Sequence, residues 1–204
     1  MKLYYHPKSP NATAVLAVAS ELGIALEIQE INLPAGEQRQ PAFLRINPNG
    51  KVPTLEDGDF ILWESGAIMQ YLASKKPGNS LWPADDRTRA DITRWQLWRF
   101  GEWGRGAGHL IWERLIKKFI GAGDADPVKV KEGLELFNTG AAVLNGHLGG
   151  RDYLVGTKPT LADFSVAVPM VYAAPAGLPL DPYPAIRQWY ARIEKIESWK
   201  KSLP

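Results

Sequence analysis

The chain has 204 residues, 45% of them hydrophobic and 23% charged, which is the composition of an ordinary globular protein with a substantial core. Its 24 basic residues are scattered among 22 acidic ones, for a formal net charge of +2, so the sequence indicates no nucleic-acid partner. The absence of cysteine excludes disulfides, thiolate metal ligands and a protein thiol as nucleophile.

Strand-like and helix-like segments alternate in the first part of the chain. The expected order is a strand at 3–5, a helix at 11–22, a strand at 26–32, a short helix at 41–46, strands at 52–55 and 60–62, and a helix at 65–75. Crossover connections make the first strands parallel, whereas a hairpin at Asp57-Gly58 makes the last two antiparallel. The sequence therefore predicts a mixed sheet with helices packed on it.

After a proline- and glycine-containing linker at 76–83, the strand signal ends and only helical patterns follow. Helices are expected at 86–118, 127–148 and 160–174, and at 184–203 in two pieces. The predicted domains are accordingly an α/β domain at 1–78 and an all-helical domain at 86–204. Four glycines between positions 101 and 108 predict a kink or a close approach by a partner or ligand, because each costs about 1 kcal/mol relative to alanine within a helix.

The segment 52–65 combines a proline at the start of a strand with two polar residues at the start of a helix. If the Val52-Pro53 bond is cis, the carbonyl and amide of Val52 turn outward and can pair with an extended ligand; a trans proline on an edge strand is the alternative. The first turn of the next helix would attract a carboxylate through its N–H groups and the Ser65 hydroxyl, and Glu64 would accept hydrogen bonds from an ammonium. Simple capping by Ser65 is the alternative there. Together the residues predict a socket for an α-amino acid head group.

Two longer runs resemble a known family. NPNGKVPTLEDGDFILWESGAIMQYLA resembles the glutathione-binding half of cytosolic glutathione transferases, and GTKPTLADFSVAVPMV resembles the capping box of their helical domain, formed here by Thr160 and Asp163. The resemblance implies a thioredoxin-like N-terminal domain with a mixed four-stranded sheet, followed by an all-α domain. It also implies a cis Val52-Pro53 bond, a γ-glutamyl group held by Glu64 and Ser65, and glutathione as co-substrate with no metal.

The junction between the first strand and the first helix carries two candidates for contact with the glutathione sulfur. Resemblance to the serine-type classes (phi, delta and theta) implies that Ser9 donates a hydrogen bond to the thiolate. Lowering a thiol pKa from about 8.5 to near 7 requires about 2 kcal/mol, which one hydrogen bond to a charged group supplies. Ser9-Pro10-Asn11 also resembles the nu class, whose activity includes glutathione-dependent disulfide reduction, so Asn11 is the rival. Asn11 as a plain helix cap and Tyr5 as the donor are the further alternatives.

Cationic and amide side chains are expected at the glycyl carboxylate of glutathione. Lys51 occupies a position where relatives carry a side chain that reaches this group, and Gln38-Arg39 resembles a second such pair. For Arg39 a solvated surface charge is the alternative. The arginine usual in the family's first helix is missing, since Ala14 and Val15 fill that stretch.

The expected function is that of an enzyme, a glutathione transferase that activates the thiol for attack on a hydrophobic electrophile. A nu-like disulfide reductase and a non-catalytic binding module with the same fold are the alternatives. The expected partners are glutathione, a small hydrophobic electrophile or disulfide, and a second copy of the chain in a homodimer, with detoxification as the role. No apolar run near the N-terminus or elsewhere approaches ~18 residues, which predicts a cytoplasmic protein with no membrane partner.

Overall fold

The computed structural model describes all residues, 1–204. By their contacts these residues form two units, one made of Met1–Ala84 with Ile196–Pro204 and the other of Asp85–Lys195. None of the helices combines the length and the hydropathy needed to cross a membrane.

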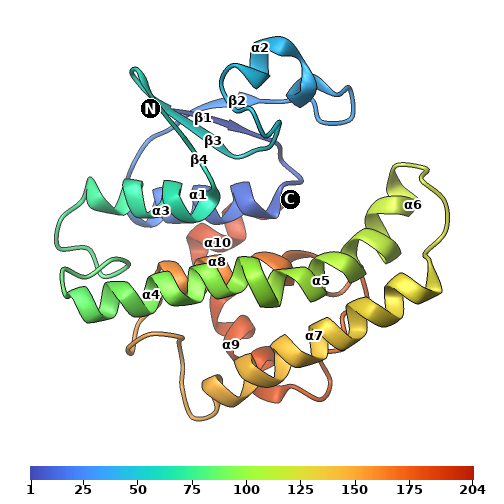
Figure 1. Cartoon of the computed structure of the whole chain (residues 1–204). Helices are drawn as coiled ribbons and strands as arrows, with labels where there is room; N and C mark the ends of the chain where they lie inside the picture. The colour runs from blue at the N-terminus through green and yellow to red at the C-terminus, as the bar shows by residue number, and fades with distance from the viewer. The chain divides into compact units, whose positions relative to one another are not determined.

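The first unit contains the mixed four-stranded sheet that the sequence predicts (Figure 1). Strand β1 (Lys2–Tyr5) lies between β2 (Glu27–Glu30), which is parallel to it, and β3 (Thr54–Asp57), which is antiparallel. Strand β4 (Phe60–Trp63) pairs with β3 through the predicted hairpin and completes the order β2-β1-β3-β4. The strand β3 begins one residue after Pro53, not at Val52 as expected, because proline has no N–H to give to the ladder.

Three helices of the first unit pack together. Helix α1 (Pro10–Glu21) lies against α3 (Ser65–Ser74), and both run beneath the strands in Figure 1. The face of α1 toward this core is made of small and β-branched residues, which lets the helix pack closely. The 3₁₀ turn η1 (Glu37–Arg39) and helix α2 (Pro41–Leu44) connect β2 to β3 and enclose a smaller core around Tyr4 and Phe43.

Helix α10 (Glu197–Ser202) is the third helix of the group that includes α1 and α3, and it packs on α1. Its Trp199 is fully buried. The contacts therefore assign the C-terminal segment to the first unit, whereas the sequence-based boundary placed it with the helical domain at 86–204. The difference arises because packing between segments far apart in sequence leaves no local signal.

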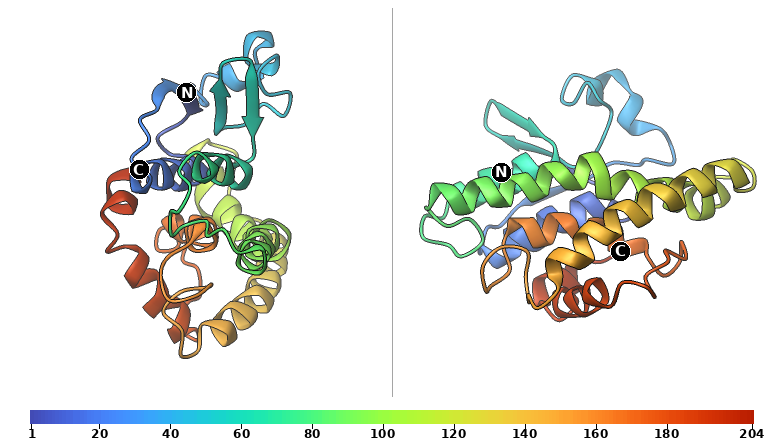
Figure 2. Two further views of the ribbon diagram at one scale, coloured as in Figure 1. Left: turned by 90° about the vertical axis from the view of Figure 1, so that its left-hand side faces the viewer. Right: turned by 60° about the horizontal axis from the view of Figure 1, so that its bottom comes forward.

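The second unit is built on one long helix and an antiparallel neighbour. The long helix comprises α4 (Asp86–Trp98), α5 (Gly104–Ile111) and α6 (Lys117–Phe119), joined by π-helical turns at 99–103 and 112–116. Helix α7 (Pro127–Leu148) runs beside it in the opposite direction (Figures 1 and 2). Both helices occupy the predicted ranges.

The glycines of the long helix are partly explained by this packing. A Cβ on Gly106 would lie 2.3 Å from the backbone nitrogen of Phe137, so the close approach of α7 requires glycine there. A Cβ on Gly104 would lie 2.6 Å from a carbonyl oxygen of the preceding π-helical turn. Gly101 and Gly108 would meet nothing within 4 Å. The structure therefore has an irregular helix where a kink was predicted, and the close approach is that of α7 in the same chain, whereas the sequence predicted a partner or ligand.

Helix α8 (Leu161–Val166) packs on α4 in the second unit, and every residue from 161 to 170 is buried. The sequence predicted one helix at 160–174, but α8 is followed by a separate 3₁₀ helix, η4 (Val168–Tyr172). Pro169 near its start has no N–H and cannot continue the α-helical hydrogen bonds. Helix α9 (Pro184–Ile193) packs on α7, and with α10 it forms the two predicted pieces of 184–203.

Candidate functional site

Three segments of the first unit meet at one end of the sheet. Helix α1 follows β1, the Val52-Pro53 segment precedes β3, and α3 follows β4. Thr54, the first residue of β3, pairs with Tyr4 on one side and with Trp63, the last residue of β4, on the other. Because β3 is antiparallel to both neighbours, the predicted site residues on these three segments come together.

Ser9 caps helix α1. Its Oγ accepts a hydrogen bond from the N–H of Ala12 at 3.4 Å, and the residue is 9% exposed. Capping uses acceptor capacity of the hydroxyl and leaves its proton available to a further acceptor. Asn11, which the sequence offered as an alternative cap, is not the cap: it is the second residue of the helix.

Asn11 and Ser65 connect the starts of α1 and α3. The Ser65 hydroxyl donates a hydrogen bond to Asn11 Oδ1 at 3.4 Å. Ser65 is 4% exposed, and Asn11 is half-buried. The residue proposed for the head group therefore adjoins one of the two candidates for the sulfur.

The start of α3 combines an uncapped first turn with a strained N-cap residue, unlike the start of α1, which Ser9 caps. No side chain caps α3, and the N–H groups of a first helical turn have no acceptor within the helix. Glu64, its N-cap residue, is exposed and has φ 74° and ψ 116°, the only non-glycine residue with positive φ. Such a conformation costs on the order of 1–3 kcal/mol and is typical of ligand-binding positions. An open helix start with its positive dipole end is an anion site.

Val52 presents a second set of unpaired backbone groups. The Val52-Pro53 bond is cis, as the resemblance implies. Neither the N–H nor the carbonyl of Val52 takes part in a hydrogen bond within the chain, whereas its side chain packs against the small core around Tyr4. The backbone is thus fixed from one side and open to hydrogen bonding on the other.

The other residues expected at the glycyl carboxylate are also brought together. Lys51 is exposed and directly precedes Val52. A Cβ on Gly50 would lie 2.9 Å from the carbonyl oxygen of Gln38, so the η1 turn lies against the Gly50-Lys51 segment. Gln38 is half-buried with its Oε1 enclosed, while Arg39 is exposed in the same turn.

Two domain descriptions match the chain: "Glutathione S-transferase, N-terminal domain" over residues 1–74, and "Glutathione S-transferase, C-terminal domain" over residues 127–192. The chain belongs to the glutathione S-transferase family. Glutathione S-transferase 3 of Zea mays is 33% identical over 208 residues, which cover 100% of this chain and 93% of that protein. Glutathione S-transferase D7 of Drosophila melanogaster is 31% identical over 206 residues, covering 100% and 88%.

Solved structures agree with the sequence relatives. The crystal structure of glutathione transferase F7 from Populus trichocarpa aligns with a TM-score of 0.90 at 26% identity, over 98% of this chain and 96% of that one. The thioredoxin-like fold of the N-terminal part and the helical fold of the C-terminal part are therefore those of a glutathione transferase.

Tyr4 lies under the candidate site of this transferase but is committed to the fold. Its hydroxyl donates to Glu56 Oε2 at 2.5 Å, and the side chain is 9% exposed. Burial, followed by the hydrogen bond to Glu56, raises the pKa of Tyr4 to about 12. A phenol held in this way stabilises the sheet and has no proton to give to a bound thiolate.

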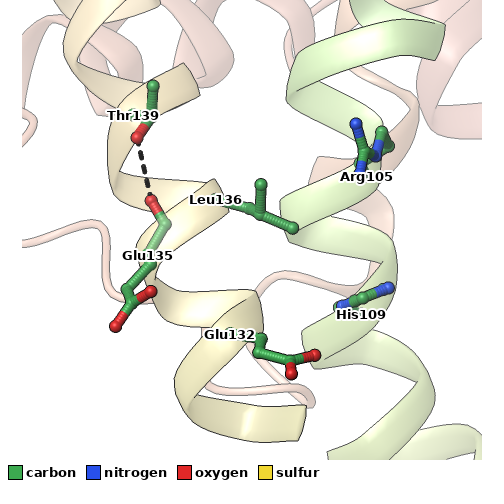
Figure 3. Close-up of a pocket in the computed structure, with 6 residues that line it drawn as sticks. All are labelled: Arg105, His109, Glu132, Glu135, Leu136 and Thr139. Carbon is green, nitrogen blue, oxygen red and sulfur yellow. Dashed lines mark hydrogen bonds between the residues drawn. The ribbon is translucent and has the colours of Figure 1, made fainter.

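The helical unit of the transferase carries an open cavity of about 350 Å³ between α5 and α7. Figure 3 shows its lining: Arg105, His109, Glu132, Glu135, Leu136 and Thr139. Arg105 and His109 are exposed on α5, and the side chain of Glu132 extends from α7 toward that helix. No group of three or more His, Cys, Asp and Glu residues in the chain could hold a metal ion.

One residue beside the candidate site was missed in the sequence. Asn47 is 1% exposed and makes hydrogen bonds along the loop that leads to Val52. The run Asn47-Pro48-Asn49-Gly50 contained the signal, because an asparagine opening a turn commonly bonds to backbone groups further along. The positive φ of Glu64 was missed as well, and no signal in the sequence marks it.

Proposed function

We propose that this chain is an enzyme, a glutathione transferase, that binds glutathione in its first unit and activates the thiol for attack on a small hydrophobic electrophile. The observation that carries the proposal is the uncapped start of α3 at the strained residue Glu64, next to Ser65 and Asn11. Family membership supports the same activity. The helical unit would supply the site for the electrophile.

Glutathione fits the groups at the end of the sheet in an extended conformation. The γ-glutamyl carboxylate would lie at the first-turn N–H groups of α3 and replace Asn11 Oδ1 as the acceptor of the Ser65 hydroxyl, with the ammonium near Glu64. The cysteinyl backbone would pair with the unbonded N–H and carbonyl of Val52, held beside Pro53, as an added strand does. Lys51 and the Gln38-Arg39 turn would supply donors to the glycyl carboxylate.

The sulfur would then lie at the start of α1. The Ser9 hydroxyl, whose oxygen already accepts from the helix, would donate its proton to the thiolate, and the positive end of α1 would add to the stabilisation. The thiol proton leaves to solvent, a carbon–sulfur bond forms at the electrophile, and the leaving group departs with its electron pair. These steps need no protein base.

The test compares two variants by the ultraviolet absorbance of bound thiolate across pH. Ser9→Ala should raise the pKa of bound glutathione by about 1–2 units, because one hydrogen bond to a charged group contributes about 1.5–3 kcal/mol. Asn11→Ala should shift it less. The reverse ranking would favour the nu-like reading, and disulfide reduction would become the preferred activity. If neither variant shifts the pKa, activation by Ser9 or Asn11 is wrong, and the N–H groups and dipole of α1, or Tyr5, would have to stabilise the thiolate.

Parallel assays with a model aryl halide and with a small disulfide separate transfer from reduction. Turnover of the aryl halide supports the transferase. Tight binding of glutathione without turnover of either substrate would instead identify a binding module. Detoxification of apolar electrophiles in the cytoplasm is the role we propose for the transferase.

A symmetric homodimer is part of the same proposal. The helical unit exposes large apolar side chains, among them Leu97 at 67% and Phe100 at 39%, which a second copy would cover. Sedimentation should therefore show twice the chain mass of 22.6 kDa at micromolar concentration. A single species at the chain mass would contradict the dimer.

A further inference from the structure

Asn47 is buried in the loop before β3, where its side chain makes hydrogen bonds to Lys51, Thr54 and Asn49. Its Nδ2 donates to the carbonyl oxygen of Lys51 at 2.8 Å and to Thr54 Oγ1 at 2.9 Å. Its Oδ1 accepts from the backbone N–H and from the side-chain amide of Asn49, both at 3.0 Å. The full capacity of the amide is therefore used, and its orientation is fixed from both ends.

Thr54 closes a triangle with these groups. Its hydroxyl donates to the same carbonyl oxygen of Lys51 at 3.2 Å, so that oxygen accepts two hydrogen bonds. Thr54 is 0% exposed and is paired on both sides in the sheet, with Tyr4 and Trp63. The Lys51 carbonyl is thereby held by a residue that is paired on both sides in the sheet.

The triangle sets the direction of a group that it does not touch. In a trans peptide the carbonyl and the following N–H point in opposite directions, and the bond between Lys51 and Val52 is trans. Because Asn47 and Thr54 draw the Lys51 oxygen toward the buried side, the N–H of Val52 must point away from them. No acceptor within the chain meets that N–H.

We infer that Asn47 and Thr54 are positioning residues for glutathione, which hold the Lys51–Val52 peptide so that the Val52 N–H faces the cysteinyl carbonyl. This inference rests on the proposed function. Neither residue would touch glutathione. Their contribution is to remove the rotational freedom of one peptide group, so that the ligand does not have to order it on binding.

Asn47→Asp is the sharpest variant because it keeps the shape of the side chain. The change retains the acceptor for Asn49 but replaces the donor with an oxygen that faces the Lys51 carbonyl. The dissociation constant for glutathione should rise roughly tenfold, as should the KM. This is the size of effect expected when hydrogen bonds between neutral groups that hold the peptide are lost. The kcat at saturating glutathione and the pKa of bound thiol should stay unchanged, because Ser9 lies on a separate segment.

Thr54 offers a matched pair of variants. Thr54→Val keeps the branched shape and removes the hydroxyl, and it should weaken glutathione binding several-fold. Thr54→Ser keeps the hydroxyl and should restore most of the lost affinity. This pair decides the question even if the Asn47 variants do not fold.

Asn79→Ala is the control for general destabilisation. Asn79 also ties a loop of the first unit, with its amide donating to Ala73 and Lys76 at 2.9 and 2.7 Å and its oxygen accepting from Trp82 at 2.9 Å. Its loss should lower the melting temperature without changing glutathione affinity, measured by calorimetry on folded protein.

The outcomes are distinguishable from failure of the proposed function. If the unaltered protein binds no glutathione, the proposed function fails. If it binds glutathione but Asn47→Asp and Thr54→Val leave the affinity unchanged, or Asn79→Ala weakens it equally, only the positioning role is overturned. A larger KM at constant kcat for the two site variants alone supports it.

Discussion

At the start of α8, the carboxylate of Asp163 accepts hydrogen bonds from the N–H groups of Leu154 and Thr160, the Thr160 hydroxyl and the Trp189 indole. At the start of α3, no side chain caps the helix, and Glu64 has a φ of 74°. The first helix start is closed by a reciprocal capping box between Thr160 and Asp163. The second is left open and strained, which is the pattern of a site completed by a ligand.

The two starts also differ in where their carboxylates lie. Asp163 is 0% exposed, and burial raises its pKa while the four donors oppose that rise. Glu64 is exposed and makes no capping hydrogen bond. A buried carboxylate with all its bonds made serves stability, whereas an exposed carboxylate on a strained backbone is free to meet a cation from outside.

The largest effect is expected at the start of α8, at the buried carboxylate of Asp163. Asp163→Ala should lower the free energy of unfolding by about 3–5 kcal/mol, because it leaves several buried donors without an acceptor. Urea unfolding measures the loss. The control is Asp152→Ala, which breaks an exposed ion pair with Arg192 and should cost under about 1 kcal/mol. Equal effects for the two variants would contradict the contrast between the helix starts.

The next effect concerns Glu64 at the start of α3. It separates the cost of the strained backbone from the contribution of the side chain to glutathione binding. Glu64→Ala and Glu64→Gly should each weaken glutathione binding roughly tenfold or more, since both remove the acceptor for the ammonium. Only Glu64→Gly should raise the free energy of unfolding, by up to about 1 kcal/mol, because glycine adopts positive φ without strain. Calorimetry and urea unfolding report the two quantities. Retained affinity in both variants would remove Glu64 from the site.

A smaller effect is expected at Tyr4 in the sheet, whose buried and hydrogen-bonded hydroxyl resembles Asp163 more than Glu64. The pKa of Tyr4 is raised from 10.0 to about 12. Between these values the unfolded chain has lost a proton that the folded chain keeps, so stability is full below pH 10 and falls as the pH rises. The slope is at most about 1.4 kcal/mol per pH unit. Urea unfolding from pH 9 to 11.5 should show a steeper decline for the unaltered protein than for Tyr4→Phe.

The smallest effect is expected at Lys51. Its side chain is exposed, so Lys51→Met should weaken glutathione binding only about two- to fivefold. The unaltered protein should also lose affinity between low and high salt, and the variant should lose less. An identical salt dependence in both proteins would place the glycyl carboxylate elsewhere.

Much of the fold could be predicted from the sequence, because local patterns of residues encode its elements. The capping box of Thr160 and Asp163 and the helical ranges 86–118 and 127–148 lie where they were predicted. The hairpin between β3 and β4 was predicted as well, but its two-residue turn is Gly58-Asp59, one position after the predicted Asp57-Gly58. The two π-helical turns were not foreseen as such, although the glycines near them indicated an irregular helix. The break at Pro169 had a local cause and was overlooked.

The features of the candidate site also differ in whether a local sequence pattern encodes them. The cis bond before Pro53 was implied by the resemblance, and polar residues at helix starts singled out Ser9 and Ser65. The hydrogen bond between Ser65 and Asn11 joins residues far apart in the chain, and no local pattern encodes it. The backbone strain at Glu64 likewise depends on how β4 meets α3 in the folded protein.

The packing of α10 on α1 has a consequence for synthesis of the protein. The first unit takes its earliest core residues from the beginning of the chain and Trp199 from near its end. Until the ribosome has added α10, the face of α1 that this helix covers has no partner. The helical unit, Asp85–Lys195, is continuous in sequence and can complete its core first. During translation, the part that would bind glutathione is therefore the first to be made and the last to be finished.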